Sequence, residues 1–321
     1  MMGNTFYWQW EVTLMEWLQG FASPILVKIA SIITLCGEEM VMVAIMGFLY
    51  WCYDKNLAKR VGVNLTTGVV WNPLVKNIFL RRRPYFDNPT IECLKPVNNE
   101  GDIMDITTQG YSFPSGHSAN AAVVYGSIAY LAGRDNADKG GASRKRRLTI
   151  VCILMPILVG ISRFFLGVHY PTDVFVGWLL GILIVFFVSL LQKKITRKPI
   201  LYLILTLVSL PGMFYCTSND YFTGFGMMVG MFAGFMFEEK YVNFSGTKNV
   251  IRCVLRLAGG FALFLGLNSV LKLPFSKELL ESASAAQFAI RTIRYAIVVF
   301  VVIGLYPMLF KYTSRFFDKS K

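Results

Sequence analysis

The feature that most restricts the fold of this chain is a series of long apolar blocks separated by short polar connections. A helix needs about 20 apolar residues to cross the roughly 30 Å hydrocarbon core of a bilayer. Hydrophobic residues make up 55% of the chain and charged residues 16%, whereas about a quarter of the residues are charged in soluble domains. Alternation with a period of two is absent, so the blocks are predicted to be helices. We expect an all-α, polytopic helical membrane protein.

About ten blocks are candidate spans, although several are short or contain a charge. Residues 1–20 contain three tryptophans and are expected to form an interfacial segment before the first span. The candidate spans are residues 21–37, 38–54, 61–80, 115–133, 148–166, 173–192, 199–216, 221–237, 252–271 and 290–310.

The net charge of +13 comes largely from basic residues in the connections between apolar blocks. Cytoplasmic loops of membrane proteins carry an excess of Lys and Arg, so this placement argues against a nucleic-acid partner. If ten spans are counted, four basic segments fall on one side, which we expect to be cytoplasmic together with both termini. The outward loop 81–114, which begins with three arginines, is an exception to the charge rule. The compact loops favour a bacterial plasma membrane. The four segments are residues 55–60, 133–147, 193–198 and 311–321.

Three polar blocks contain residue types that suit catalysis. The first begins at Lys76 and reads K-N-I-F-L-R-R-R-P, the second begins at Pro114 and reads P-S-G-H, and the third begins at Ser162 and reads S-R-x5-H-x3-D. Both histidines of the chain lie in these blocks. In the predicted topology all three blocks lie at the non-cytoplasmic ends of spans. The cysteines show no CxxC or Cys/His spacing, so neither a metal site nor another cofactor is predicted.

These residues are suited to phosphoryl transfer, which requires cations for the phosphate oxygens, an in-line nucleophile and an acid for the leaving oxygen. Lys76, Arg83 and Arg163 can supply the cations. Ser115 and Gly116 open a helix after a proline, so backbone N–H groups there can bind an anion.

The two histidines are predicted to divide the remaining chemistry. Asp173 lies about one helical turn after His169 and can hold one imidazole nitrogen, which leaves the other nitrogen as a nucleophile. His117 has no such partner in the sequence. We therefore predict that His117 is the general acid that protonates the leaving oxygen.

Together the blocks resemble the type 2 phosphatidic acid phosphatase superfamily, which also includes glucose-6-phosphatases and vanadium haloperoxidases. All three motifs are present without substitution across residues 76–173. The resemblance implies metal-independent hydrolysis through a phosphohistidine, and a six-helix catalytic core. It implies the same roles for His169, His117 and Asp173. It also implies phosphate binding by Lys76, Arg83, Ser115, Gly116 and Arg163.

On this basis residues 21–198 are expected to form the phosphatase core, and residues 199–321 to add about four further spans. The expected partner is a lipid substrate with a phosphomonoester or pyrophosphate, such as phosphatidic acid, a sphingoid-base phosphate, phosphatidylglycerol phosphate or a polyprenyl pyrophosphate. The same residues would serve a lipid phosphotransferase or a phosphatase for a soluble sugar phosphate. A transporter or scaffold is disfavoured because the motifs are intact.

Five other charged positions lie at or near the ends of predicted spans. Arg81 and Arg82 are expected to bind anionic headgroups at the membrane interface. Lys28 lies close enough to a span end to reach the interface. Glu238 and its neighbour Glu239 are expected at a cytoplasmic span end, with no role in function.

Overall fold

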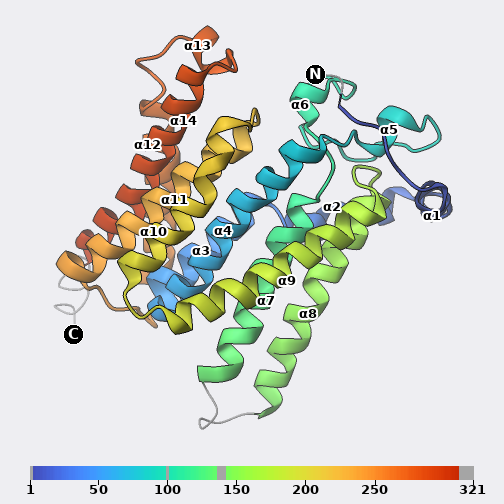
Figure 1. Ribbon diagram of the computed structural model, residues 1–321. Coiled ribbons are helices and arrows are strands. Elements are labelled where there is room, and N and C mark those ends of the chain that lie inside the picture. Colours follow the sequence, from blue (N-terminus) through green and yellow to red (C-terminus); the bar gives the residue numbers. More distant parts are fainter. Residues whose placement is uncertain (1–2, 99–100, 136–141, 311–321) are drawn as a thin grey trace. The chain divides into compact units, whose positions relative to one another are not determined.

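A computed structural model describes residues 3–98, 101–135 and 142–310 of the chain (Figure 1). All regular elements in these ranges are helices, apart from one β-bridge between Asn4 and Arg81. The all-α prediction is therefore confirmed. Residues 136–141 and 311–321, which contributed to the predicted orientation, lie outside the described residues. The chain forms two compact units, one of Met1–Met42 and Trp71–Phe187 and the other of Val43–Val70 and Val188–Lys321.

The first unit contains the three sequence motifs. Within it α2 and α7 both pack against α8. The unit also includes the beginning of α3 (Glu39–Phe48) and the end of α4 (Lys55–Phe79). Its other helices are α1 (Gln9–Gln19), α2 (Pro24–Leu35), α5 (Pro84–Asp87), α6 (Ile106–Gln109), α7 (Gly116–Asp135), α8 (Ala142–Phe165) and most of α9 (Pro171–Lys194).

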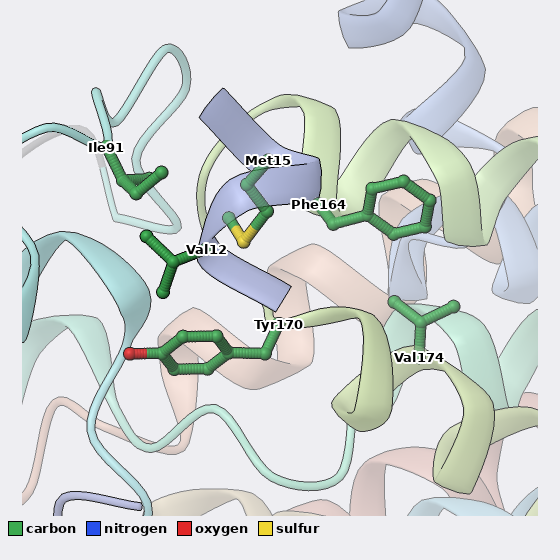
Figure 2. Close-up of a cluster of buried hydrophobic side chains, with 6 residues drawn as sticks. All are labelled: Val12, Met15, Ile91, Phe164, Tyr170 and Val174. Atoms are coloured by element: carbon green, nitrogen blue, oxygen red, sulfur yellow. The ribbon is translucent and has the colours of Figure 1, made fainter. Parts of the chain in front are cut away.

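Helix α1 is held against the connection between α8 and α9 by a small apolar cluster (Figure 2). Val12 and Met15 lie three residues apart, so they share one face of α1. They pack on Phe164, Tyr170 and other buried residues of the cluster. The tryptophans of α1 lie elsewhere on the helix and are exposed, as an interfacial segment requires. Burial of one apolar face therefore fixes α1 beside the third sequence motif.

The second unit contains the C-terminal helices α10 (Lys198–Ser209), α11 (Asn219–Phe237), α12 (Val250–Val270), α13 (Lys277–Glu281) and α14 (Ala285–Phe300). Helices α11 and α14 pack against each other. A Cβ at Gly226 or Gly230 would lie 2.3 Å from the carbonyl oxygen of Thr292 or Ala296, respectively. Small residues four apart allow this close approach of two helix backbones, as in many membrane helix pairs.

A buried charge network connects helices within the second unit. Glu238 is fully buried and accepts hydrogen bonds from Lys55 at 2.9 Å and Lys59 at 2.6 Å. Lys59 also reaches Glu239 at 2.9 Å. Glu238, for which the sequence indicated no functional role, therefore neutralises two of the basic residues that contributed to the predicted orientation.

Four helices in the described ranges are long and apolar enough to cross a membrane: Arg146–Phe165, Pro171–Lys194, Val250–Val270 and Ala285–Leu309. Helices α1 and α2, which meet at a bend of 120°, together could provide a fifth. The chain is thus an integral membrane protein with several helical spans. The other predicted spans also lie on helices, but they are shorter or more polar. In α4, for example, Asn64 and Asn72 are buried and lower the hydropathy. The count of about ten spans stays a prediction.

Candidate active site

Arg83 is fixed at the connection between α4 and α5. Lys76 lies in the last turn of α4, and Arg83 immediately precedes α5, whose first residue is proline. The buried Arg83 guanidinium donates from Nε to the carbonyl oxygens of Gln109 at 2.9 Å and Gly110 at 3.0 Å, and from Nη1 to that of Val168 at 2.8 Å. Backbone groups from two separate connections therefore hold this cation in one orientation.

His169 lies in the tight connection between α8 and α9. The connection turns at Gly167, which has a φ of +78°, and a Cβ there would lie 2.0 Å from the carbonyl oxygen of Glu92. Only glycine fits this position without strain and collision. The turn places His169 just before α9, with its side chain only 3% exposed.

The contacts of His169 define which of its nitrogens can attack. Nε2 lies 3.4 Å from Nη1 of Arg83, a group that can only donate. Nε2 must then carry the lone pair, and Nδ1 the hydrogen, in the neutral ring. Nδ1 lies 3.5 Å from Oδ2 of Asp173, which is long for a hydrogen bond, and within the described ranges Nδ1 has no other partner. Catalytic hydrogen bonds are often long before substrate binds.

The surroundings of His169 keep its imidazole neutral. Burial lowers the pKa of His169 well below its usual value of 6.5, and the positive charges of Arg83, Arg163 and Lys76 lower it further. Each of these causes penalises the imidazolium form. The ring is therefore unprotonated at neutral pH, which is the form a nucleophile requires.

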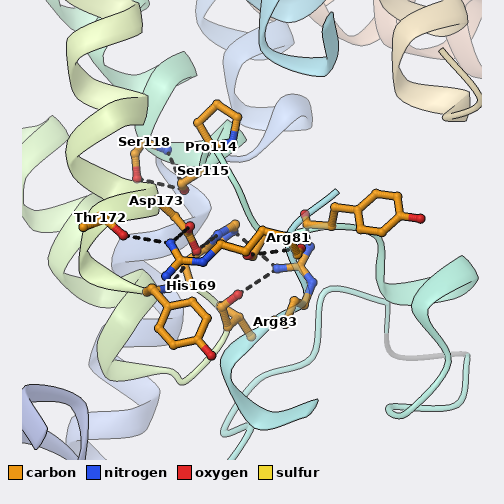
Figure 3. Close-up of polar contacts among 12 residues, drawn as sticks. Arg81, Arg83, Pro114, Ser115, Ser118, His169, Thr172 and Asp173 are labelled. Carbon is orange, nitrogen blue, oxygen red and sulfur yellow. Dashed lines mark hydrogen bonds and ion pairs between the residues drawn. The ribbon is translucent and has the colours of Figure 1, made fainter. Parts of the chain in front are cut away.

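Asp173 is held by a chain of buried ion pairs that the sequence did not indicate; Figure 3 shows its first member, Arg81, beside Asp173. Its Oδ1 accepts a hydrogen bond from Arg81 at 2.7 Å, and its Oδ2 accepts one from the backbone N–H of Tyr170 at 2.8 Å. The other Arg81 nitrogen donates to Glu11 of α1 at 3.0 Å. Glu11 also accepts from the N–H of Thr172 at 3.0 Å. The carboxylate beside His169 is therefore fixed by one donor at each oxygen, and one of these donors, Arg81, is itself held by Glu11.

This arrangement corrects the expectation for Arg81. Its side chain is 2% exposed and lies between two carboxylates, so it cannot bind headgroups at the surface. Arg82 has a 29% exposed side chain and a 3.3 Å ion pair with Asp87, so for Arg82 headgroup binding stays a prediction. Sequence analysis missed Arg81, Glu11 and Thr172 as neighbours of the candidate site. For Glu11 the sequence did contain one indication: an acidic residue directly beside the apolar face of α1 is expected to have a buried partner.

The P-S-G-H motif forms the beginning of α7. Ser115 is fully buried, its Oγ accepts hydrogen bonds from Ser118, and its N–H donates to the carbonyl oxygen of Asp173 at 2.9 Å. Ser115 therefore caps α7 and joins the two motifs (Figure 3). Gly116 and His117 follow in the first turn, where N–H groups have no acceptor within the helix. Phosphate binding by Ser115 and Gly116 stays a prediction.

Helix α9 can approach this helix start because it carries a glycine there. A Cβ at Gly177 would lie 2.7 Å from the carbonyl oxygen of Ser115. A Cβ at Gly37, in the turn after α2, would lie 2.9 Å from the carbonyl oxygen of His117. Close backbone packing on both sides therefore sets the position of the P-S-G-H segment within the unit.

Arg163 lies in the last turn of α8 and is 3% exposed. Its Nη1 donates to Thr34 of α2 at 2.9 Å. The structure thus brings Asp173 to 3.5 Å and Arg83 to 3.4 Å from the two ring nitrogens of His169. Arg163, Lys76 and His117 act electrostatically on the same imidazole. The roles assigned to these residues stay predictions. Among the residues that the structure describes, no three His, Cys, Asp or Glu side chains are grouped as a metal site.

Comparison with known proteins identifies relatives of both parts of the chain. Residues 57–197 match the PAP2 superfamily, and residues 222–315 match the transmembrane extension of PAP2 superfamily phosphatases. The chain is 45% identical over 87 residues to phosphatidylglycerophosphatase B of Bacillus subtilis, a match that covers 27% of this chain and 42% of that protein. It is 29% identical over 147 residues to an undecaprenyl-diphosphatase of Sulfolobus acidocaldarius, covering 45% of this chain and 60% of that protein.

The chain thus spans about half the length of these two relatives. A crystal structure of a transmembrane PAP2 type phosphatidylglycerolphosphate phosphatase from Bacillus subtilis is also similar. It has 28% sequence identity and a TM-score of 0.45, and the match covers 60% of this chain and 90% of that one.

Proposed function

Because this chain belongs to the PAP2 superfamily of membrane phosphatases with a transmembrane extension, we propose that it removes phosphate from a lipid through a phosphohistidine on His169. The observation that carries this proposal is the environment of one imidazole. His169 is buried, neutral and directed by Asp173 and Arg83, and three cations act on it. A nucleophile among cations suits an anionic phosphorus centre.

In the proposed first step, Nε2 of His169 attacks phosphorus and the bond from phosphorus to the leaving oxygen breaks. Burial and the nearby cations lower the pKa of His117, and the negative charge of the bound phosphate opposes this lowering, so His117 is proposed to be protonated in the complex. His117 donates this proton to the leaving oxygen, so the lipid leaves as a neutral alcohol, or as a phosphate if the substrate is a pyrophosphate. Arg83, Arg163 and Lys76 neutralise the equatorial oxygens. In the second step His117 accepts a proton from water, the water oxygen attacks phosphorus, and the P–N bond breaks to release inorganic phosphate. The proposed mechanism uses no metal ion or other cofactor.

The proposed substrate is a membrane lipid that ends in a phosphomonoester or pyrophosphate. The similarity to a phosphatidylglycerophosphatase and to an undecaprenyl-diphosphatase supports this class. Phosphatidylglycerol phosphate is the first candidate because the identity to its phosphatase is 45% in the matched region. A lipid can present its phosphate at the membrane boundary while its chains stay in the bilayer.

The proposed topology has about ten spans, with six helices of the catalytic core in residues 21–198 and four spans in residues 199–321. Both termini are proposed to be cytoplasmic and the active site non-cytoplasmic, in a bacterial plasma membrane. Support comes from the basic segments that follow the second, fourth, sixth and tenth predicted spans. Labelling of single cysteines by an impermeant reagent tests this topology: a cysteine at position 104 should react from outside and one at position 196 should not.

The function is tested by phosphate release from purified full-length protein in detergent with EDTA, over a panel of the candidate lipids and a sugar phosphate. We expect release from a lipid phosphate without an added acceptor alcohol, and loss of this release in His169→Ala. Equal thermal stability of the two proteins shows that the variant is folded. Release that depends on Mg²⁺, or that persists in the variant, contradicts the mechanism. Transfer only to an added alcohol would identify a phosphotransferase.

A further inference from the structure

A cavity of about 450 Å³ lies in the second unit, between the end of α12, the helix α13 and the first half of α14. It is independent of the residues proposed for catalysis. Its polar lining consists of Lys272, Lys277, Glu281, Gln287, Arg291 and Arg294. The volume is in the range of cavities that hold small ligands.

The cavity carries an excess of positive charge. Among its lining residues four are cationic, and Glu281 is the one acidic residue. Glu281 lies 4.0 Å from Lys277, and both of these side chains are mostly exposed. In the described part of the chain no carboxylate lies within ion-pair distance of Lys272, Arg291 or Arg294. Asp220 acts on Arg291 electrostatically but forms no ion pair with it. The inner part of the cavity is therefore positive.

Two of the lining side chains are buried and have polar atoms without a partner. Arg294 is 5% exposed, and its Nε has no hydrogen-bond partner among the described residues. Gln287 is 2% exposed; its Nε2 donates to Asn219 at 2.9 Å, while its Oε1 is unpaired. A buried guanidinium is costly unless an anion compensates its charge. The lining is thus built for a negatively charged ligand.

The titration of Lys272 supports this interpretation. Burial lowers the pKa of Lys272, and the nearby charges of Arg294 and Arg291 lower it further. The three cations therefore repel one another. A bound anion would relieve this repulsion, and Arg side chains can bind phosphate oxygens in a bidentate manner.

We propose that this cavity binds the phosphate headgroup of an anionic membrane lipid. Its walls include the C-terminal end of α12 and the N-terminal half of α14. Both helices are long and apolar enough to cross the membrane, so the cavity is expected at the depth of the lipid headgroups. Next to the cationic lining are exposed apolar side chains that suit lipid chains, including Val270 at 56% and Leu273 at 80% exposure. Basic pockets between membrane helices bind anionic headgroups in this way. A free phosphate ion would use the cations but not the apolar surface.

The proposal is tested with native mass spectrometry of the full-length protein in detergent. The probes are phosphatidylglycerol and phosphatidylcholine with identical acyl chains, both of which are phosphodiesters, and inorganic phosphate as a competitor. The test variant Lys272→Gln/Arg291→Gln keeps the buried Arg294. The matched control Lys193→Gln/Arg197→Gln removes two exposed charges elsewhere in the same unit. Measurements are repeated with His169→Ala, so that binding is separated from turnover.

We expect wild type and His169→Ala to bind phosphatidylglycerol preferentially, and the test variant to bind it about tenfold or more weakly. The control should keep wild-type affinity. Arg294→Gln should lose binding as well, and the double variant answers the question if Arg294→Gln does not fold. Equal binding of the two lipids, or equal losses in test and control variants, would overturn the proposal. Displacement by inorganic phosphate at the lipid's own concentration would overturn its lipid part and identify a site for soluble phosphate.

Discussion

Two adjacent arginines provide a sharp test of how the candidate site is held together. Arg81 lies between Asp173 at 2.7 Å and Glu11 at 3.0 Å, and all three side chains are at most 2% exposed. Arg82 forms an ion pair with Asp87 at 3.3 Å and is 29% exposed. Replacement of each arginine by alanine removes the same groups from neighbouring positions, so the comparison isolates the effect of burial.

The expected magnitudes differ strongly. Removal of one partner from a buried ion pair costs about 3–5 kcal/mol, because the other charge is left buried and unpaired. Arg81→Ala leaves two such carboxylates, but both keep hydrogen bonds from backbone N–H groups, so we expect about 3 kcal/mol or more. The loss of stacking on Tyr170, whose ring centre is 4.0 Å from the guanidinium, adds to this. Arg82→Ala should cost less than about 1 kcal/mol.

The assay is thermal unfolding of both variants in the same detergent, combined with steady-state kinetics below the transition. Arg81→Ala should unfold at a clearly lower temperature than Arg82→Ala, and its kcat should fall because Asp173 is no longer fixed beside His169. Arg81→Lys should restore part of the stability, since it restores a charge but not the two-sided geometry. If the two alanine variants have the same stability, the buried ion-pair chain does not hold the site.

Three further predictions concern the same unit. The pKa of His169 is lowered, so the reactive neutral form persists as the pH falls, and the acid-side decline of kcat/KM should occur only below about pH 6.5 after correction for the substrate's own titration; an acid-side decline centred above that value would contradict the neutral nucleophile, whereas a decline at higher pH would report deprotonation of His117. Asp173→Asn should lower kcat more than it changes KM, because it disturbs the nucleophile and not the phosphate-binding cations, and an increase in KM alone would refute this role. Gly177→Ala should reduce both activity and thermal stability, because the new Cβ would lie 2.7 Å from the carbonyl oxygen of Ser115. The control Gly266→Ala adds a Cβ with no atom within 4 Å and should be neutral or slightly stabilising. Equal thermal stabilities of the two variants would refute the close packing.

The sequence was sufficient for the helical fold and for the local geometry of the motifs. The length of the apolar blocks predicts membrane-spanning helices directly, because about 20 apolar residues are needed to cross the bilayer as a helix. The short spacing of His169 and Asp173 also predicted that they lie close together, although His169 precedes α9 and only Asp173 lies in its first turn. Nδ1 of His169 and Oδ2 of Asp173 lie 3.5 Å apart, which agrees with this local prediction.

Contacts between distant segments were harder to predict. The spacing of apolar residues in α1 does not indicate that Glu11 forms an ion pair with an arginine 70 residues away. Polar residues inside helices raise a similar difficulty. Asn64 is buried in α4 and donates to Ser189 at 3.0 Å within the second unit, and α4 is not among the helices that hydropathy identifies as candidate spans. In both cases the partner comes from tertiary packing, which one sequence does not specify.

The three arginines before Pro84 show what local reasoning could still have added. A residue that precedes proline is restricted to extended backbone, and Arg83 has a φ of −75° and a ψ of 155°. In an extended segment successive side chains point to opposite sides. Arg81 and Arg83 should therefore share one side and Arg82 the other. The structure agrees, since Arg81 and Arg83 are buried and Arg82 is partly exposed. Arg83 is the arginine of this motif that is predicted to bind phosphate. The same alternation therefore places Arg81, and not Arg82, on the side of the candidate site.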